Sequence, residues 1–262
     1  MTMQTFTQLD SFTILGLSVL PALIYVVLIY LSSPVRSINI KTALRFFFIG
    51  FISILLCIYL KKLFFPNGYQ SILIGATRGM QEMFFFNKAF FEVAILEEGS
   101  KLLAFLIGYS FLKKKNEEFH PIGLMFYCSM VSLGFAVLEN FEYGLYYGKS
   151  VLLTRTFTAV IIHLTLGLMM GYAIAHSKIK TTRFVKTPID LILRHSDQKM
   201  AYYAIFGWIV ATFFHGLYDL NLFLKHDSDF VIMIMIIGIC IATSYWMYTD
   251  LVRKYLRRNL KN

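Results

Sequence analysis

Long apolar runs separated by short polar segments dominate the chain. A helix needs about 20 apolar residues to cross the hydrocarbon core of a bilayer, because it rises 1.5 Å per residue. Seven runs reach this length and predict membrane spans at residues 11–31, 44–65, 90–112, 120–144, 152–176, 200–224 and 229–251. The pattern therefore predicts an all-α, polytopic bundle of transmembrane helices, with about seven spans.

Two regions need separate interpretation. The first run, residues 11–31, is too long for the core of a signal peptide and lacks a clear cleavage site, so we interpret it as a retained span. Residues 66–89 hold a shorter apolar piece broken by glycine and arginine, which is compatible with a re-entrant segment, an interfacial segment or an eighth span. The polar segments are too short for a soluble domain, so we expect residues 1–262 to form a single membrane domain.

Lysine and arginine are distributed unevenly between the two predicted sides of the membrane. The segments on one side carry seventeen of them, in residues 32–45, 113–119, 177–199 and the tail after 251, and the opposite side carries seven. Cytoplasmic loops are enriched in these residues. The bias predicts an N-terminus outside, a cytoplasmic C-terminus and an odd number of spans.

Composition supports a membrane protein. The chain is 57% hydrophobic and 15% charged, and its mean hydropathy is +0.63. The net charge of +10 is explained by cationic cytoplasmic loops that face anionic lipid, so the lipid bilayer and not nucleic acid is the expected partner. Cys57, Cys128 and Cys240 lie in apolar runs without CxxC spacing, which indicates neither a disulfide framework nor a thiolate metal site.

Glycines predict close helix packing in the second half of the chain. Gly134 lies inside the fourth predicted span, and Gly167 and Gly171 form a small-xxx-small pattern in the fifth. Such positions let the backbones of neighbouring membrane helices approach each other.

Several spans carry polar side chains at depths where hydrocarbon would surround them. These are Glu97, Glu98 and Lys101 in the third span, Glu139 and Asn140 in the fourth, His163 in the fifth, and His215 and Asp219 in the sixth. With the predicted orientation, Glu97 lies roughly 10 Å and His215 roughly 13 Å from the outer edge. Isolated charges at this depth cost several kcal/mol, so these groups must face the bundle interior and pair with one another. We expect a shared polar site in the outer half of the membrane.

Local spacing suggests how these groups interact. His215 and Asp219 are four residues apart on one helix face, so Asp219 can orient the imidazole. Lys101 follows Glu97 by four residues and Glu98 by three, so it can neutralise one carboxylate and leave the other free.

The polar side chains within the predicted spans permit two kinds of hydrolytic chemistry. The zinc-protease pattern HExxH and the serine-hydrolase pattern GxSxG are both absent. In one mechanism a glutamate activates water while the histidines stabilise the developing oxyanion. In the other, His163, His215 and Glu97 hold a zinc ion that polarises water. A proton relay or proton-coupled transporter could use the same polar layer, although no inverted repeat is detectable.

Four segments resemble, in order, the motifs of the PrsW family of intramembrane proteases, which belongs with the glutamic-type CAAX-protease and bacteriocin-processing superfamily. They are EEGSK at 97–101, SLGFAVLEN at 132–140, RTFTAVIIHLTLGLMMGY at 155–172 and HGLYD at 215–219. The resemblance covers about residues 90–225.

The resemblance implies a multi-pass protease of the bacterial inner membrane. It would make the first, extracytoplasmic cut in a single-span anti-sigma factor. The implied catalytic residues are Glu97, Glu98, His163 and His215, and the implied supporting residues are Lys101, Glu139, Asn140 and Asp219. Glu97 and His163 would activate water, and no cofactor would be required. Activation of water by zinc is the alternative. His215 and Asp219 would stabilise the oxyanion or orient the groups that do so.

Two departures from the wider superfamily affect the assignment of roles. The CAAX-type branch has EExxxR and HxxxN, whereas this chain has EExxK and ends the last motif in Asp219. An ionised aspartate cannot donate to an oxyanion, so we assign Asp219 to orienting His215 and the oxyanion role to His215 itself. A CAAX-type or peptide-processing protease is the remaining alternative, and it would open its site toward the cytoplasm.

Overall fold

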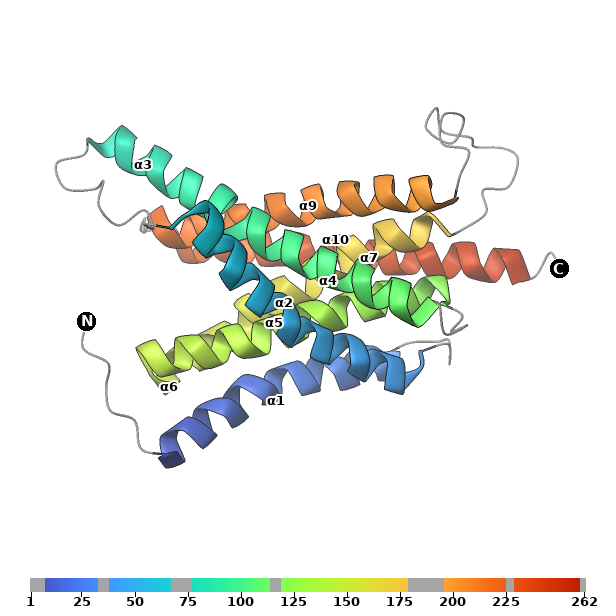
Figure 1. Ribbon diagram of the computed structural model, residues 1–262, viewed down its shortest axis with the longest axis horizontal. Coiled ribbons are helices and arrows are strands. Elements are labelled where there is room, and N and C mark those ends of the chain that lie inside the picture. Colours follow the sequence, from blue (N-terminus) through green and yellow to red (C-terminus); the bar gives the residue numbers. More distant parts are fainter. Residues whose placement is uncertain are drawn as a thin grey trace.

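The computed structural model of the chain describes residues 8–32, 38–66, 77–113, 119–178, 196–224 and 229–259 (Figure 1). The first half contains α1 (Gln8–Ser32), α2 (Ile40–Phe64), α3 (Arg78–Asn87), a π-helix (Lys88–Ala94) and α4 (Ile95–Lys113). The second half contains α5 (Pro121–Tyr147), α6 (Lys149–Phe157), α7 (Ala159–His176), α9 (Ser196–Leu224) and α10 (Asp229–Asn259). The described residues contain no strand, and the predicted all-α class is confirmed.

Within the described residues, six helical stretches are long and apolar enough to cross a membrane. They are Asp10–Leu28, Ile40–Phe64, Pro121–Tyr147, Lys149–His176, Lys199–Leu224 and Phe230–Tyr255. The third predicted span, residues 90–112, is also helical and packs against α2, α5 and α9. It does not reach the same apolarity, because Glu97, Glu98 and Lys101 lie within it. The polytopic bundle is therefore confirmed with six apolar spans and a charged helix, α4, packed among them.

The region 66–89 contributes no separate crossing in its described part. Residues 67–76 lie outside the described residues. From Arg78 onward, α3 continues through the π-helix into α4, so that it extends the third predicted span. Figure 1 shows α3 projecting beyond the other helices at one end of the bundle.

The two ends of the bundle can be told apart by the helix termini that meet there. α1 begins at the left end of Figure 1 and α10 finishes at the right end, as an odd number of crossings requires. We call the left end, where α2, α5 and α9 end, the predicted outer end. That this end faces the outside of the cell stays a prediction. It is based on lysines and arginines in the loops, many of which lie outside the described residues.

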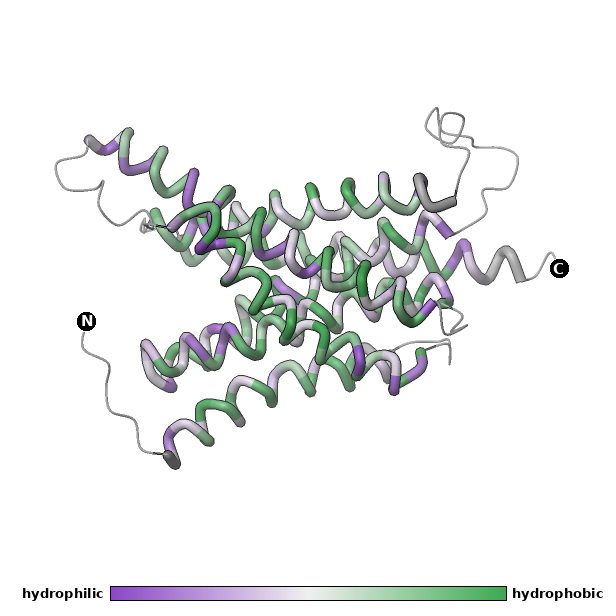
Figure 2. Tube along the Cα trace, in the orientation of Figure 1, coloured by the Kyte–Doolittle hydropathy of each residue, from purple (hydrophilic) through white to green (hydrophobic). Residues whose placement is uncertain are grey.

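Helices α5 and α7 form the centre of the bundle. In the most apolar stretch of α5, 89% of the residues are buried, and the corresponding share for α6 and α7 together is 78%. The shares for α1, α2, α9 and α10 lie between 22% and 39%. Figure 2 shows apolar residues along these outer helices, which present large side chains such as Ile52 and Phe213 outward. Lipid is the solvent that suits this surface.

Glycines make the central contacts possible, as predicted. Gly134 of α5 lies against the backbone of α2, and a Cβ atom at this position would overlap the carbonyl oxygen of Phe47. On α7, a Cβ atom on Gly171 would lie 2.6 Å from the Cα of Met125. A Cβ atom on Gly167 would lie 2.7 Å from the Cα of Ser129. Any larger residue would push α5 away from its neighbours.

We predict that Gly134→Ala destabilises the protein and that Gly238→Ala does not. Both positions are helical, but a Cβ atom on Gly238 would meet no atom within 4 Å. Overpacking should cost Gly134→Ala about 1–3 kcal/mol, whereas Gly238→Ala should gain up to about 1 kcal/mol from helix propensity. Thermal unfolding in detergent micelles measures the difference. Equal melting temperatures for the two variants would contradict the close α2–α5 contact.

Candidate active site

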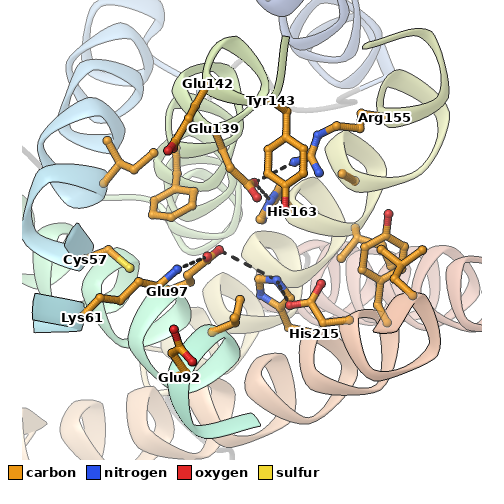
Figure 3. Close-up of a pocket in the computed structure, with 18 of the residues that line it drawn as sticks. Cys57, Lys61, Glu92, Glu97, Glu139, Glu142, Tyr143, Arg155, His163 and His215 are labelled. Atoms are coloured by element: carbon orange, nitrogen blue, oxygen red, sulfur yellow. Dashed lines mark hydrogen bonds and ion pairs between the residues drawn. The ribbon is translucent and has the colours of Figure 1, made fainter. Parts of the chain in front are cut away.

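A cavity of about 540 Å³ opens at the predicted outer end of the bundle (Figure 3). Its wall is built by α2, the π-helix and α4 on one side and by α5, α6, α7 and α9 on the other. The acidic, basic and histidine residues in the wall are Lys61, Lys88, Glu92, Glu97, Glu139, Glu142, Arg155, His163, His215 and Asp219. Five of the eight residues of the predicted polar layer thus line this cavity, and Glu98, Lys101 and Asn140 lie outside its wall.

Glu97 lies in the first turn of α4, directly after the π-helix. A π-helical turn contains an extra residue, which rotates the side chains that follow it, and such turns are frequent at functional sites. Glu97 is only 3% exposed, and its Oε1 accepts a hydrogen bond from the Nζ of Lys61 at 2.9 Å. Its Oε2 has no hydrogen-bond partner among the described residues. Glu97 therefore presents one unsatisfied carboxylate oxygen at the cavity wall.

Glu98 has a different environment from its neighbour. It is fully buried and does not belong to the cavity wall. Its Oε1 lies 2.7 Å from the Nζ of Lys101 and 2.7 Å from the Nδ1 of His215. Lys101 therefore neutralises Glu98, as the three-residue spacing predicted. Glu97 forms its ion pair with Lys61 instead.

His163 on α7 is held by hydrogen bonds at both ring nitrogens. Its Nδ1 lies 2.9 Å from the Nζ of Lys101, and its Nε2 lies 2.7 Å from the Oε2 of Glu139. The same oxygen of Glu139 lies 3.0 Å from the Nη2 of Arg155. The Nε of Arg155 donates to the Oδ1 of Asn140 at 2.6 Å. Glu139 and Asn140, adjacent on α5, are thereby tied to the end of α6.

His215 on α9 is oriented by Glu98 rather than by Asp219. The Nδ1 of His215 makes the 2.7 Å hydrogen bond to Glu98, whereas its Nε2 lies 3.4 Å from the Oδ2 of Asp219 and 3.9 Å from the Oε2 of Glu97. Asp219 Oδ2 has no hydrogen-bond partner among the described residues. The spacing of four residues placed Asp219 on the correct helix face, but a carboxylate from the neighbouring helix makes the shorter contact.

Three of the expected catalytic residues converge. The rings of His163 and His215 lie 5.3 Å apart between centroids, nearly perpendicular to each other. Glu97, His163 and His215 each offer one donor atom, and these atoms all lie within 4.8 Å of one another. They come from α4, α7 and α9, so that the centre exists only when these helices are packed together.

The donor set fits a metal ion. Two histidines and one glutamate are the protein ligands of many open zinc sites. Buried carboxylate oxygens of Glu97 and Asp219 lack hydrogen-bond partners among the described residues, which is costly unless a cation or water satisfies them. The immediate surroundings also contain four carboxylates, of Glu97, Glu98, Glu139 and Asp219, but three cationic side chains, of Lys61, Lys101 and Arg155.

Sequence reasoning missed Lys61 and Arg155. Both were counted as cations of the outer loops, yet Lys61 pairs with Glu97 and Arg155 pairs with Glu139. Charge balance could have found them, because the expected site held four carboxylates and Lys101 as its one cation. Such an excess in hydrocarbon requires further cations at the same depth.

Comparison with known proteins gives a consistent result. Residues 39–247 match the family described as PrsW family intramembrane metalloprotease. The chain is 28% identical to Protease PrsW of Oceanobacillus iheyensis over 225 residues, which is 85% of this chain and 87% of that protein. It is 24% identical to Protease PrsW of Geobacillus kaustophilus over 214 residues, or 82% and 81% of the two chains. No solved structure gives a significant match.

We predict that Arg155→Met strongly destabilises the protein. Arg155 is buried and compensates Glu139, so its removal leaves a buried carboxylate with too few partners. Breaking such a pair costs about 3–5 kcal/mol. Arg78→Met is the matched control, because that ion pair with Glu82 is exposed and should contribute less than about 1 kcal/mol. Thermal unfolding of both variants in micelles tests this, and similar losses of stability would contradict the buried network.

Proposed function

Since the chain belongs to the PrsW family of intramembrane proteases, we propose that it cuts a single-span membrane protein near its extracytoplasmic side. The observation that carries this proposal is the convergence of Glu97, His163 and His215 on the wall of a cavity at the predicted outer end. The proposed substrate is an anti-sigma factor, and the proposed location is the bacterial inner membrane.

The reaction is peptide hydrolysis at this centre. Water oxygen bonds to the carbonyl carbon of the substrate, and the bond from that carbon to nitrogen then breaks. Glu97 is the residue suited to move the proton, because its Oε2 is unpartnered and its carboxylate converges with His163 and His215 on the cavity wall. It takes a proton from water and delivers it to the leaving nitrogen, as a general base that becomes a general acid. His163 borders the same space, held by Lys101 and Glu139.

The position of the cavity favours a cut close to the membrane surface. A peptide carbonyl inside a transmembrane helix is hydrogen-bonded and shielded by side chains, so the substrate must unwind before water can attack. Unwinding costs least where water can satisfy the freed backbone groups. A cavity that opens at the outer end therefore supports cleavage of a juxtamembrane segment.

A metal ion would be held by the same residues. In this alternative mechanism Glu97, His163 and His215 would supply the donor atoms. Glu97 would then be a ligand and not the base, and Nδ1 of His163 would give up its contact with Lys101. A zinc ion bound there would act as a Lewis acid toward water and the substrate carbonyl. Glu98 and Glu139 would orient the two histidine rings, as they already do through hydrogen bonds of 2.7 Å.

A proton relay is the second candidate function. A continuous series of hydrogen bonds runs from His215 through Glu98, Lys101 and His163 to Glu139. Glu97 is not a link in this series, since its hydrogen bond goes to Lys61. Substitution of Glu97 therefore separates the two functions, because it removes the base for hydrolysis and leaves the series intact.

We predict that Glu97→Gln abolishes one extracytoplasmic, juxtamembrane cut in a single-span protein of the host membrane. Loss of a general base lowers the rate by about 10²–10⁴-fold. Mapping of new protein termini in membranes with wild type or variant at matched expression measures this. Glu82→Gln is the control, since Glu82 is an exposed residue on α3. Identical termini with wild type and a folded Glu97→Gln protein would refute the protease proposal and favour the relay.

We further predict that zinc analysis separates the two mechanisms: in the metal mechanism the purified protein carries about one zinc ion per chain, and His215→Ala loses it. Metal analysis of protein purified without added zinc measures the content directly. Cys128→Ala is a suitable control, because Cys128 is buried on α5 but does not line the cavity. Full cleavage activity in a metal-free preparation would instead assign water activation to Glu97 alone.

A further inference from the structure

Hydrolysis at the proposed centre requires a donor for the negative charge that develops on the substrate carbonyl oxygen. The histidines are poorly placed to supply it. Both ring nitrogens of His163 are engaged, by Lys101 and Glu139. The Nδ1 of His215 bonds the carboxylate of Glu98, and its Nε2 lies 3.4 Å from Asp219 Oδ2 and 3.9 Å from Glu97 Oε2, so a proton on Nε2 would face these two carboxylates. The oxyanion donor is therefore to be sought among other groups on the cavity wall.

Among the described residues, three cationic side chains line the cavity, and two of them are engaged by other groups. Arg155 binds Asn140 and Glu139, and its guanidinium lies 3.8 Å from the ring centroid of Tyr143. The ammonium of Lys88 lies over the ring of Phe223, 5.4 Å from its centroid. Neither makes a contact with Glu97, His163 or His215 that the described structure records.

Lys61 is the third of these cations, and it reaches the centre. It lies in the last turn of α2, and its Nζ is 2.9 Å from the Oε1 of Glu97. Its side chain is 32% exposed, whereas that of Lys101 is 1% exposed and lies outside the cavity wall. An ammonium group has three donors, and the bond to Glu97 uses one of them. Lys61 therefore has donors left for a substrate beside Glu97 (Figure 3).

We propose that Lys61 is a catalytic residue of the proposed hydrolysis, on which this inference rests. One N–H of its ammonium fixes Glu97 Oε1, so that Oε2 faces the reacting water, and another donates to the carbonyl oxygen of the scissile peptide. When water adds, the carbonyl π electrons move to that oxygen, and Lys61 stabilises the charge. The electrons return when the bond to nitrogen breaks, and Lys61 neither gains nor loses a proton.

The adjacent lysine supplies a matched control. Lys62 follows Lys61 on α2, but it is exposed and lies outside the cavity wall. A substitution of Lys62 therefore removes the same charge from the same turn without reaching the centre.

The test compares Lys61→Met, Lys61→Arg and Lys62→Met in proteoliposomes. The probe is the single-span protein whose cut depends on Glu97, purified as the substrate. Loss of one oxyanion donor should lower kcat by about 10²–10³-fold in Lys61→Met, with KM changed less than about threefold. Lys61→Arg should retain more activity than Lys61→Met because it keeps a cation, and Lys62→Met should match wild type. Melting temperature and zinc content are measured on each variant, so that loss of folding or of a metal ligand is recognised.

A second variant covers the case in which Lys61→Met unfolds. Lys61→Ala leaves room in the cavity, and added propylammonium should partly restore its kcat, which a merely structural lysine would not show. A kcat of folded Lys61→Met within about threefold of wild type would overturn the inference. So would failure of propylammonium to restore Lys61→Ala. If wild type and Lys62→Met also fail to cut the probe, the proposed protease function itself is refuted, and so is the catalytic role of Lys61.

Discussion

The cost of placing charge in hydrocarbon governs the arrangement of this molecule. Each buried carboxylate must find a cation or a hydrogen-bond donor, because the bilayer offers no water at that depth. The partners come from other helices in most cases: Lys61 of α2 for Glu97, His215 of α9 for Glu98, and Arg155 of α6 for Glu139. The network that builds the site therefore also ties together the helices at the predicted outer end of the bundle.

Close helix packing gives this network its fixed geometry. Gly134 brings α2 against α5, and Gly171 brings α5 against α7, so the helices that carry Lys61, Glu139 and His163 approach one another closely. Side chains on packed helices lose less freedom on binding a substrate than side chains on loops would. The centre is thus held in place before a substrate arrives, which is the condition for electrostatic stabilisation of a transition state.

The sequence predicts the elements of this fold better than the contacts between them. Apolar runs of about 20 residues are sufficient to locate the helices, and the cost of buried charge is sufficient to gather Glu97, His163 and His215 into one layer. Spacing along one helix cannot reveal a partner on another. For this reason Asp219, four residues after His215, was expected to orient it, whereas Glu98 on α4 does so. The continuity of α3 with α4 was likewise hidden, because α3 is too polar to be recognised as an extension of a span.

The two adjacent glutamates illustrate how the same residue type acquires two roles. Successive residues on a helix point about 100° apart, so Glu98 faces the packed interior while Glu97 faces the cavity. Glu98 is enclosed by Lys101 and His215 and has little freedom to move a proton. Glu97 has one oxygen held by Lys61 and the other free. Pairing every charge would give a stable but inert cluster. Glu97 combines an unpartnered carboxylate oxygen with a place beside His163 and His215 on the cavity wall, and this combination gives the bundle its capacity for chemistry.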